Sequence, residues 1–308
     1  MKISGKVAAA ARMILILTVL VLAGCTAGGL TATEPKADGQ AASQYNNNSE
    51  PVNQPVKAAQ PEKSLPLPRP ELGVPAAEAK NPDKTAIKER VVYLTFDDGP
   101  NSHFTGRVLE ILAQKNARAT FMVLGKNVVL NPELIKRIIS EGHGISNHSY
   151  SHDYANIYSS PEAFIAELEE NSKVLMPYTG KPVMVFRAPG GPQKLSPALL
   201  EKLKKGGYTS VGWNVTSADS DPNGITQQQL YDNVIGGLER IERMNRTPIV
   251  LMHDGTQLST TDVRPGSASA VYIQNREAVV AALPSIIDHL KSKGYSFGVV
   301  DQHTPPAW

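Results

Sequence analysis

From Val91 to the end of the chain, hydrophobic and polar positions follow two different periods. Short runs rich in β-branched and aromatic residues predict strands, and the longer segments between them repeat apolar residues with the period of a helix. The predicted strands are 91–96, 119–123, 144–147, 184–186, 209–213, 249–252 and 296–300. The predicted helices are 105–115, 132–141, 161–176, 196–205, 226–243 and 276–293. Strands that alternate with helices favour an α/β domain with a parallel sheet.

Capping residues mark the ends of several predicted helices. Some starts place a capping side chain before a proline in the first helical position. These starts are Asn131-Pro132, Ser160-Pro161 and Ser196-Pro197. Gly142, Gly206 and Gly294 follow predicted helices and can adopt the left-handed conformation that ends a helix. The pattern still leaves two architectures open, a barrel and a doubly wound open sheet.

The amino-terminal segment has the features of an export signal. Basic residues precede an apolar run over 13–22, which is shorter than a membrane-spanning helix. The run ends in Leu22-Ala23-Gly24-Cys25, which resembles the lipobox of bacterial lipoproteins. The resemblance implies that residues 1–25 are a lipoprotein signal and that Cys25 carries lipid. An ordinary signal peptide and a short uncleaved anchor are the alternatives. Lipidation would hold an exported protein at the outer face of the bacterial cytoplasmic membrane, within the cell wall.

Residues 26–88 are rich in proline, and Tyr45 is their only aromatic residue. Such a segment buries too little apolar surface to offset the entropy of ordering, so we predict a disordered tether. Because proline-rich chains are stiff and extended, the tether would hold the following domain, residues 89–304, away from the bilayer.

Charge and cysteine content exclude several functions. The 31 basic and 29 acidic residues give a net charge of +2, which predicts no broad basic surface and hence no nucleic acid partner. A single cysteine excludes an internal disulfide and a CxxC metal site. None of these features predicts the oligomeric state.

Polar residues gather directly after the predicted strands. In either architecture the loops at the carboxyl ends of parallel strands converge on one face, where α/β enzymes build their sites. The residues are Thr95-Phe96-Asp97-Asp98-Gly99-Pro100, His148-Ser149-Tyr150-Ser151-His152, Arg187-Ala188-Pro189-Gly190-Gly191, Asp219 and His253-Asp254. Five separate loops are therefore expected to supply one pocket.

Two histidines and one of the aspartates form a ligand set for a divalent metal. His148 and His152, with a carboxylate, would leave an open position for water. Because Gly99-Pro100 ends the first strand, Asp97 and Asp98 can both turn toward the same cavity. One aspartate would bind the metal, and the other would accept a proton from water whose pKa the metal lowers.

Two further residues suit supporting roles in such chemistry. His253 can protonate a leaving group, particularly if Asp219 favours its charged form. Arg187 can hold an aspartate in place and keep it ionised. The residues alone therefore predict metal-assisted hydrolysis without identifying the bond.

Four motifs, in order, resemble one family. They are Thr95-Phe96-Asp97-Asp98-Gly99-Pro100, His148-x-x-x-His152, Arg187-x-Pro189-x-Gly191 and Leu251-x-His253. This set resembles the polysaccharide deacetylases of carbohydrate esterase family 4, also called the NodB homology domain, over about residues 89–300. The resemblance implies a distorted (β/α)7 barrel, which agrees with the seven predicted strands and decides between the two architectures.

The resemblance implies a role for each metal-site residue. It makes Asp97 the catalytic base and makes Asp98, His148 and His152 the ligands of a divalent metal, commonly zinc. Cobalt, nickel and iron suit the same ligands almost equally. Arg187 is implied to orient the base.

It also assigns the residues that would hold the substrate. His253 is implied to be the general acid and Asp219 its partner. Leu251 would line the pocket for the acetyl methyl group, and the backbone N–H of Gly190 would help to stabilise the oxyanion.

Two positions depart from the commonest pattern of the family. Gly190 stands where many members carry tyrosine, and Ser220 stands where many carry tryptophan. Glycine keeps its N–H, so the donor survives, but the two aromatic walls of the common pattern are missing at these positions. Trp213 and Tyr150 are candidates for stacking on a sugar ring, with plain packing as the alternative.

Other polar residues have simpler expectations. Asp254 either supports the site or caps a loop, and residues 255–272 are predicted to be a long connection that forms a rim or filler. The histidines outside the motifs are predicted to be surface or turn residues. These are His103, His143, His289 and His303.

The predicted function is metal-dependent removal of N-acetyl groups from an N-acetylglucosamine-containing glycan. Peptidoglycan is the first choice because a lipid anchor and a tether would place the domain in the wall. Chitin-like oligomers, poly-N-acetylglucosamine and O-acetyl xylan are alternatives of the same class. A lipoprotein that binds glycan without turnover is the alternative from a different class.

Overall fold

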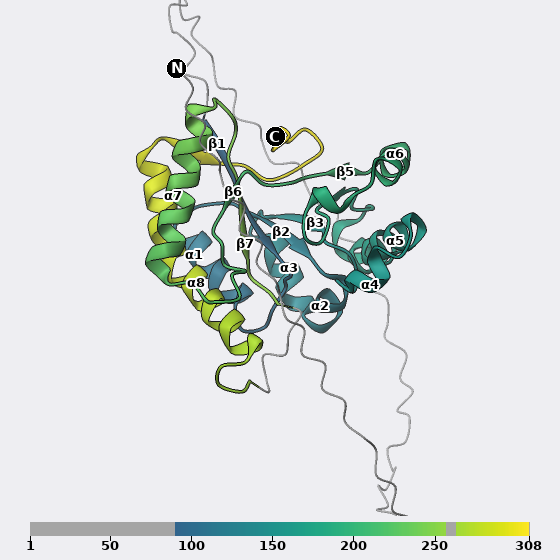
Figure 1. Cartoon of the computed structure of the whole chain (residues 1–308). Helices are drawn as coiled ribbons and strands as arrows, with labels where there is room; N and C mark the ends of the chain where they lie inside the picture. The colour runs from purple at the N-terminus through teal and green to yellow at the C-terminus, as the bar shows by residue number, and fades with distance from the viewer. Residues whose placement is uncertain (1–89, 257–262, 308) are drawn as a thin grey trace, which may run out of the picture. The chain divides into compact units, whose positions relative to one another are not determined.

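The computed structural model describes residues 90–256 and 263–307 (Figure 1). The predicted signal segment (1–25), the lipid attachment residue Cys25 and the predicted tether (26–88) lie outside the described residues. Among the helices of the described part, none is both long enough and apolar enough to cross a membrane.

The strands form one parallel sheet that curls into an open barrel. Its order is β5-β4-β3-β2-β1-β7-β6, and β8 pairs with the amino-terminal part of β1. The strands are β1 (Arg90–Asp97), β2 (Thr120–Val123), β3 (Gly144–Asn147), β4 (Val185–Phe186), β5 (Thr209–Ser210), β6 (Val215–Thr216), β7 (Ile249–His253) and β8 (Tyr295–Phe297). Because β5 and β6 are the two edges, the barrel stays open between them. The predicted distorted barrel is confirmed, with one short strand, β6, that the sequence pattern did not predict.

All six predicted helices are present, and further short turns of helix join them. The helices are α1 (Thr105–Gln114), α2 (Gly125–Leu130), α3 (Pro132–Ser140), α4 (Tyr154–Ile157), α5 (Pro161–Thr179), α6 (Pro197–Lys205), α7 (Gln227–Arg243) and α8 (Ala268–Ser292). The sequence pattern missed α2, α4 and a short 3-10 turn over 192–194. α8 begins at Ala268 rather than at residue 276, so part of the predicted connection over 255–272 is helical.

The predicted caps are correct for some helices and wrong for others. The hydroxyls of Ser160 and Ser196 accept hydrogen bonds from the backbone at the starts of α5 and α6. Asn131 does not cap α3, and its side-chain amide donates instead to the carbonyl of Pro100. Gly206 has a φ of −77°, and the next residue, Gly207, adopts the left-handed conformation instead.

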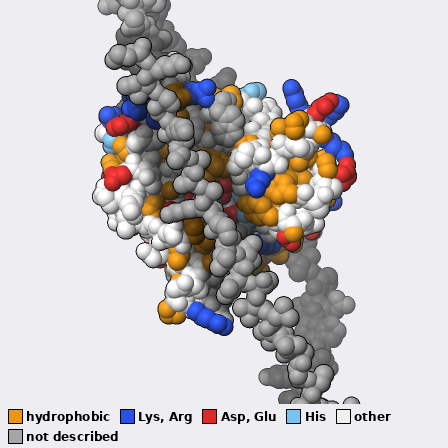
Figure 2. Space-filling view, in the orientation of Figure 1, with side chains coloured by type: hydrophobic (Ala, Val, Ile, Leu, Met, Phe, Trp, Pro, Cys, Tyr) orange, Lys and Arg blue, Asp and Glu red, His pale blue; other side chains and the backbone are white. Residues whose placement is uncertain are grey.

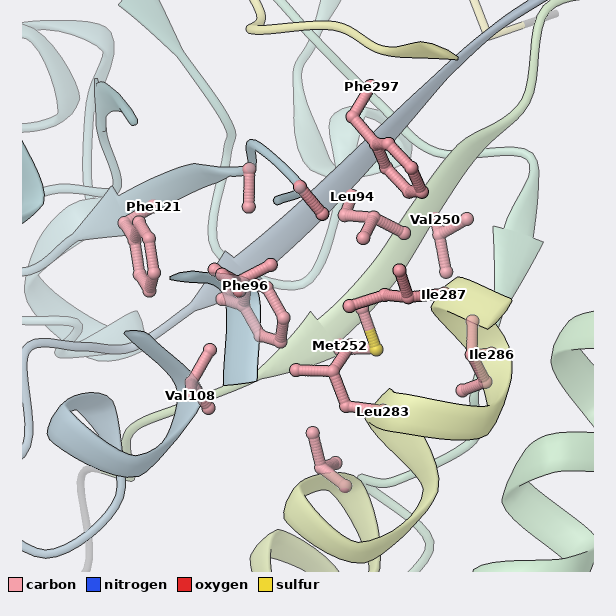
Figure 3. Close-up of a cluster of buried hydrophobic side chains, with 14 of the residues drawn as sticks. Leu94, Phe96, Val108, Phe121, Val250, Met252, Leu283, Ile286, Ile287 and Phe297 are labelled. Atoms are coloured by element: carbon pink, nitrogen blue, oxygen red, sulfur yellow. The ribbon is translucent and has the colours of Figure 1, made fainter. Parts of the chain in front are cut away.

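Alternation along β1 separates the main core from the interior of the barrel. Side chains of β1 and β7 that face outward pack against α8 (Figure 3). They include Leu94, Phe96, Val250 and Met252, which lie against Leu283, Ile286 and Ile287. Burying each such side chain contributes about 1.5–3 kcal/mol. Because successive strand residues face opposite sides, Thr95 and Asp97 face into the barrel.

The surface of the described part carries charges of both signs. On the face shown in Figure 2, acidic and basic side chains are mixed along the outline of the molecule. This mixture agrees with the small net charge of +2.

Candidate active site

Three side chains from two loops meet at the carboxyl end of the sheet. Asp98 follows β1, and His148 and His152 follow β3. Oδ1 of Asp98 lies 3.5 Å from Nε2 of His148 and 3.4 Å from Nε2 of His152. The potential ligand atoms of these residues lie within 4.8 Å of one another. The structure therefore brings together the three residues that the sequence grouped as metal ligands.

Unusual backbone conformations direct these side chains into one cavity. Asp98 has a φ of 70°, Ser149 a φ of 77° and His152 a φ of 58°. Residues other than glycine seldom occupy this left-handed region, and such strain concentrates at functional sites. The turn at Asp98 breaks the strand alternation, so Asp97 and Asp98 both line the same pocket.

The protonation states of Asp98 and His152 suit a cation. Burial lowers the pKa of His152 to about 4, so its imidazole is neutral at neutral pH. Burial alone would raise the pKa of Asp98, but the charges of His152, His253 and His148 outweigh it and lower this pKa to about 2. The site therefore presents one carboxylate and neutral imidazole, the forms that bind metal.

The hydrogen bonds of the site leave ligand atoms free. Nδ1 of His148 lies 2.9 Å from the carbonyl oxygen of Arg187 and must donate to it, which leaves the Nε2 lone pair for a metal. Oδ1 of Asp98 is buried and has no hydrogen-bond partner among the described residues. A buried carboxylate oxygen without a partner is costly, and a divalent cation would satisfy it. The donor set thus fits a metal with an Asp/His/His site.

Asp97 lies beside this ligand set, and Arg187 holds its carboxylate in place. Its Oδ1 accepts a hydrogen bond of 2.7 Å from Nη1 of Arg187, and its Oδ2 lies 3.7 Å from Nε2 of His148. The fully buried Arg187 also donates to Thr95 Oγ1 at 2.8 Å and to the carbonyl of Gly212 at 2.9 Å. One oxygen of Asp97 is therefore fixed, and the other remains available toward the cavity.

His253 and Asp219 form a second pair across the pocket. Nδ1 of His253 lies 2.8 Å from Oδ1 of Asp219, and the His253 backbone N–H donates to Oδ2 at 2.7 Å. Burial alone would lower the pKa of His253, but the charge of Asp219 outweighs it and raises this pKa. Arg276, which the sequence analysis missed, donates to the carbonyl of Asp219 at 2.8 Å and to that of Gly255 at 2.7 Å. The pair is thus anchored from α8.

The two aspartates at the end of β1, the two histidines after β3 and His253 line a cavity of about 240 Å³, which we call the reaction pocket; Arg187 and Asp219 lie behind its lining. Of the proposed substrate residues, Gly190, Leu251 and Trp213 line it. Tyr150 lies outside it, with its ring packed against Gly125 at the start of α2. That contact is packing, the alternative that the sequence left open for Tyr150.

Tyrosines that the sequence analysis missed form part of the pocket wall. Tyr154 is the first residue of the short helix α4, and Tyr272 lies in the first turns of α8. The four-residue helix α4 has too few positions to show a helical period, and Tyr272 fell in a predicted connection. Tyr154 could have been predicted from the sequence as a pocket residue, because it follows the proposed ligand His152 by two positions.

Asp254 supports the loop that carries the aspartates. Its side chain accepts from the hydroxyl of Thr105, and its backbone N–H donates to the carbonyl of Asp97 at 3.2 Å. A Cβ at Gly99 would lie 2.4 Å from Oδ2 of Asp254, so glycine is required there. Burial raises the pKa of Asp254 to about 7. Asp254 therefore fits both alternatives that the sequence left open, because it holds a loop in place and that loop carries residues of the site.

The other histidines lie away from the reaction pocket. His103 and His303 are exposed, as predicted. His143 was also predicted to be a surface or turn residue, but it is only 8% exposed and its Nδ1 accepts from the backbone of Ala119. It is a buried structural histidine.

Comparison with known proteins gives consistent matches. Residues 84–211 match the family model described as polysaccharide deacetylase. A peptidoglycan-N-acetylglucosamine deacetylase from Bacillus cereus is 31% identical over 214 residues, which is 70% of this chain and 88% of the relative. A chitooligosaccharide deacetylase from Rhizobium leguminosarum is 30% identical over 221 residues, 71% of this chain and 94% of the relative.

A solved structure shows the same fold. The crystal structure of a polysaccharide deacetylase from Bacillus cereus matches with a TM-score of 0.56 and 31% identity, over 71% of this chain and 96% of that chain. The fold and site define a metal-dependent hydrolase of the α/β class. The chain belongs to the polysaccharide deacetylase family, as its motifs indicated.

Proposed function

We propose that the protein removes N-acetyl groups from the N-acetylglucosamine residues of peptidoglycan, with zinc as the bound metal. The observation that carries this proposal is the position of Asp97, a carboxylate held by Arg187 next to the Asp98, His148 and His152 set. Two relatives from Bacillus cereus are peptidoglycan-N-acetylglucosamine deacetylases, which supports the choice of glycan.

The polar groups that were predicted from the sequence each have a role in amide hydrolysis. A divalent cation at Asp98, His148 and His152 would polarise the acetyl carbonyl and lower the pKa of water. Asp97 accepts the proton of the attacking water through its free oxygen, while Arg187 keeps the carboxylate oriented. The backbone N–H of Gly190, a residue that lines the pocket, has no backbone partner among the described residues and would donate to the developing oxyanion.

The leaving amine needs a proton, and His253 supplies it. Asp219 holds Nδ1 of His253, which leaves Nε2 to donate. Leu251 and Trp213 line the pocket and would contact the acetyl methyl group and the sugar ring.

Acetate release from a panel of glycans, coupled to metal analysis of the full chain, tests the function. We expect release from peptidoglycan, and one bound zinc ion per chain. Activity restricted to chitin-like oligomers or poly-N-acetylglucosamine would change the substrate, and activity on acetylated xylan alone would refute the amide assignment. Binding of glycan without any acetate release would support a non-catalytic lipoprotein instead.

The pH dependence of the reaction tests the His253–Asp219 pair. A general acid works in its protonated form, so activity is lost as pH rises through the pKa of His253. Asp219 raises this pKa, so we expect Asp219→Asn to move the alkaline limb of the kcat/KM profile to lower pH. Asp232→Asn, at an exposed position on α7, is the matched control and should leave the limb in place. If the alkaline limb did not move in Asp219→Asn, His253 would not be the general acid.

We also propose that the protein is a lipoprotein anchored at the outer face of the cytoplasmic membrane. The support is the sequence Leu22-Ala23-Gly24-Cys25 after an apolar run. We expect Cys25→Ala to abolish incorporation of labelled fatty acid and to shift the protein out of the lipoprotein fraction. Equal labelling of the wild type and Cys25→Ala would contradict lipidation at this residue.

A further inference from the structure

Tyr154 occupies the space that the missing side chain of residue 190 leaves. Gly190 has a φ of 71°, and a Cβ built on it would lie 2.7 Å from the hydroxyl oxygen of Tyr154. The Tyr154 ring lies edge-on to the ring of His152, with centroids 5.2 Å apart and an interplanar angle of 75°. Tyr154 is 41% exposed, and its hydroxyl has no hydrogen-bond partner among the described residues. The ring thus forms one wall of the reaction pocket and keeps its polar end available.

Tyr154 also lines a second cavity. We call it the outer cleft, and its volume is about 460 Å³, within the ~300–1,000 Å³ of small-molecule sites. Its lining includes Tyr154, Tyr158, Ser160, Lys194, Ser196 and Leu199. The rings of Tyr154 and Tyr158 lie 5.8 Å apart, and the Tyr158 hydroxyl donates to the carbonyl of Pro189 at 2.6 Å. Because Tyr154 lines both cavities, the outer cleft neighbours the reaction pocket across this residue.

The outer cleft carries one positive charge and no negative charge. Lys194 is the only ionisable residue in its lining besides the tyrosines, and it forms no salt bridge with any other described residue. An exposed ammonium group beside aromatic rings and serine hydroxyls suits a sugar that bears a carboxylate. A neutral sugar would use the rings and hydroxyls but leave the ammonium without a partner.

We propose that the outer cleft is a second sugar subsite, which takes the neighbouring unit of the glycan and recognises its carboxylate through Lys194. This inference rests on the proposed function and deepens it. Peptidoglycan alternates N-acetylglucosamine with a sugar whose lactyl carboxyl group is a free carboxylate wherever the stem peptide has been removed, whereas chitin has no carboxylate. The subsite therefore selects for the carboxylated chain, with Tyr154 as the wall shared between the two sugars.

Two tetrasaccharides of equal length test whether the charge of Lys194 recognises the carboxylate. One is derived from peptidoglycan and keeps free lactyl carboxylates, and the other is the same compound with these groups reduced to alcohols. With the full chain we expect Lys194→Gln to raise KM for the carboxylated compound about tenfold, equivalent to ~1.4 kcal/mol. The same variant should leave kcat, and KM for the reduced compound, unchanged. Lys204→Gln, at an exposed lysine of α6 outside the cleft, is the matched control and should match the wild type on both.

A second variant tests the shared wall separately from the charge. Tyr154→Ala should raise KM for both tetrasaccharides alike, and Tyr154→Phe, which keeps the ring, should retain most of the affinity. The proposal is overturned if Lys194→Gln affects both compounds equally or neither, or if Tyr154→Ala leaves both KM values unchanged. If the wild type releases acetate from neither compound, the proposed function fails. If it deacetylates both with the same KM, the function stands and the subsite fails.

Discussion

Asp97→Asn should lower kcat by about 10²- to 10⁴-fold, the usual contribution of a general base, while the protein still binds its metal. The substitution keeps the shape of the side chain but removes the proton acceptor that faces the cavity. Because Asp98, His148 and His152 form the ligand set without Asp97, the metal content should match that of the wild type. Single-turnover acetate release together with elemental analysis of the same sample makes this measurement.

A loosened Arg187 is the competing explanation for such a loss, and a second variant separates the two. Thr95→Val removes the Arg187–Thr95 hydrogen bond of 2.8 Å but leaves the Asp97 carboxylate and its own 2.7 Å bond to Arg187. We expect Thr95→Val to lose less than about tenfold in kcat, because the general base and its own hydrogen bond to Arg187 remain in place. If Asp97→Asn lost no more than Thr95→Val, Asp97 would be a structural residue and another group would have to accept the proton.

The parts of the site that the sequence predicted are those that strand topology fixes. Parallel strands have their carboxyl ends at one edge, so residues that follow β1, β3, β4 and β7 must lie near one another. The hydrophobic alternation of Leu94 and Phe96 likewise places Asp97 on the inner face of the barrel. Topology and period thus sufficed for Asp97, Arg187 and His253 without any knowledge of side-chain contacts.

The parts that the sequence did not predict depend on single backbone angles and on contacts between distant segments. Gly99-Pro100 predicted that Asp97 and Asp98 share one cavity, but no hydrophobic pattern records the φ of 70° by which Asp98 turns into it. The anchoring of Asp219 by Arg276 joins two segments 57 positions apart in the sequence. The α8 helix begins before its apolar period becomes regular, so the sequence pattern placed its start too late and left Tyr272 in a loop.

The loss of a metal ligand gives the second large effect. We expect His148→Ala to lose stoichiometric metal after dialysis against a chelator and to lose the deacetylase activity that depends on it. Only one imidazole and one carboxylate would remain, and the hydrogen bond from Nδ1 to the Arg187 carbonyl would also disappear. His143→Ala is the matched control, since it also truncates a buried histidine near β3 but one outside the reaction pocket. It should keep the metal even if it lowers the stability of the fold.

Thermal unfolding distinguishes loss of a ligand from general damage. A ligand that binds only the folded state stabilises it by RT ln(1 + [L]/Kd), which is ~2.7 kcal/mol at a hundredfold excess over Kd. Chelation should therefore lower the Tm of the wild type and of His143→Ala by similar amounts, because both keep the ligand set. It should leave the Tm of His148→Ala unchanged, because that variant has no bound metal to lose. If His148→Ala kept stoichiometric metal and a chelator-sensitive Tm, the cation would have to bind through other residues, and the assignment of His148 as a ligand would be wrong.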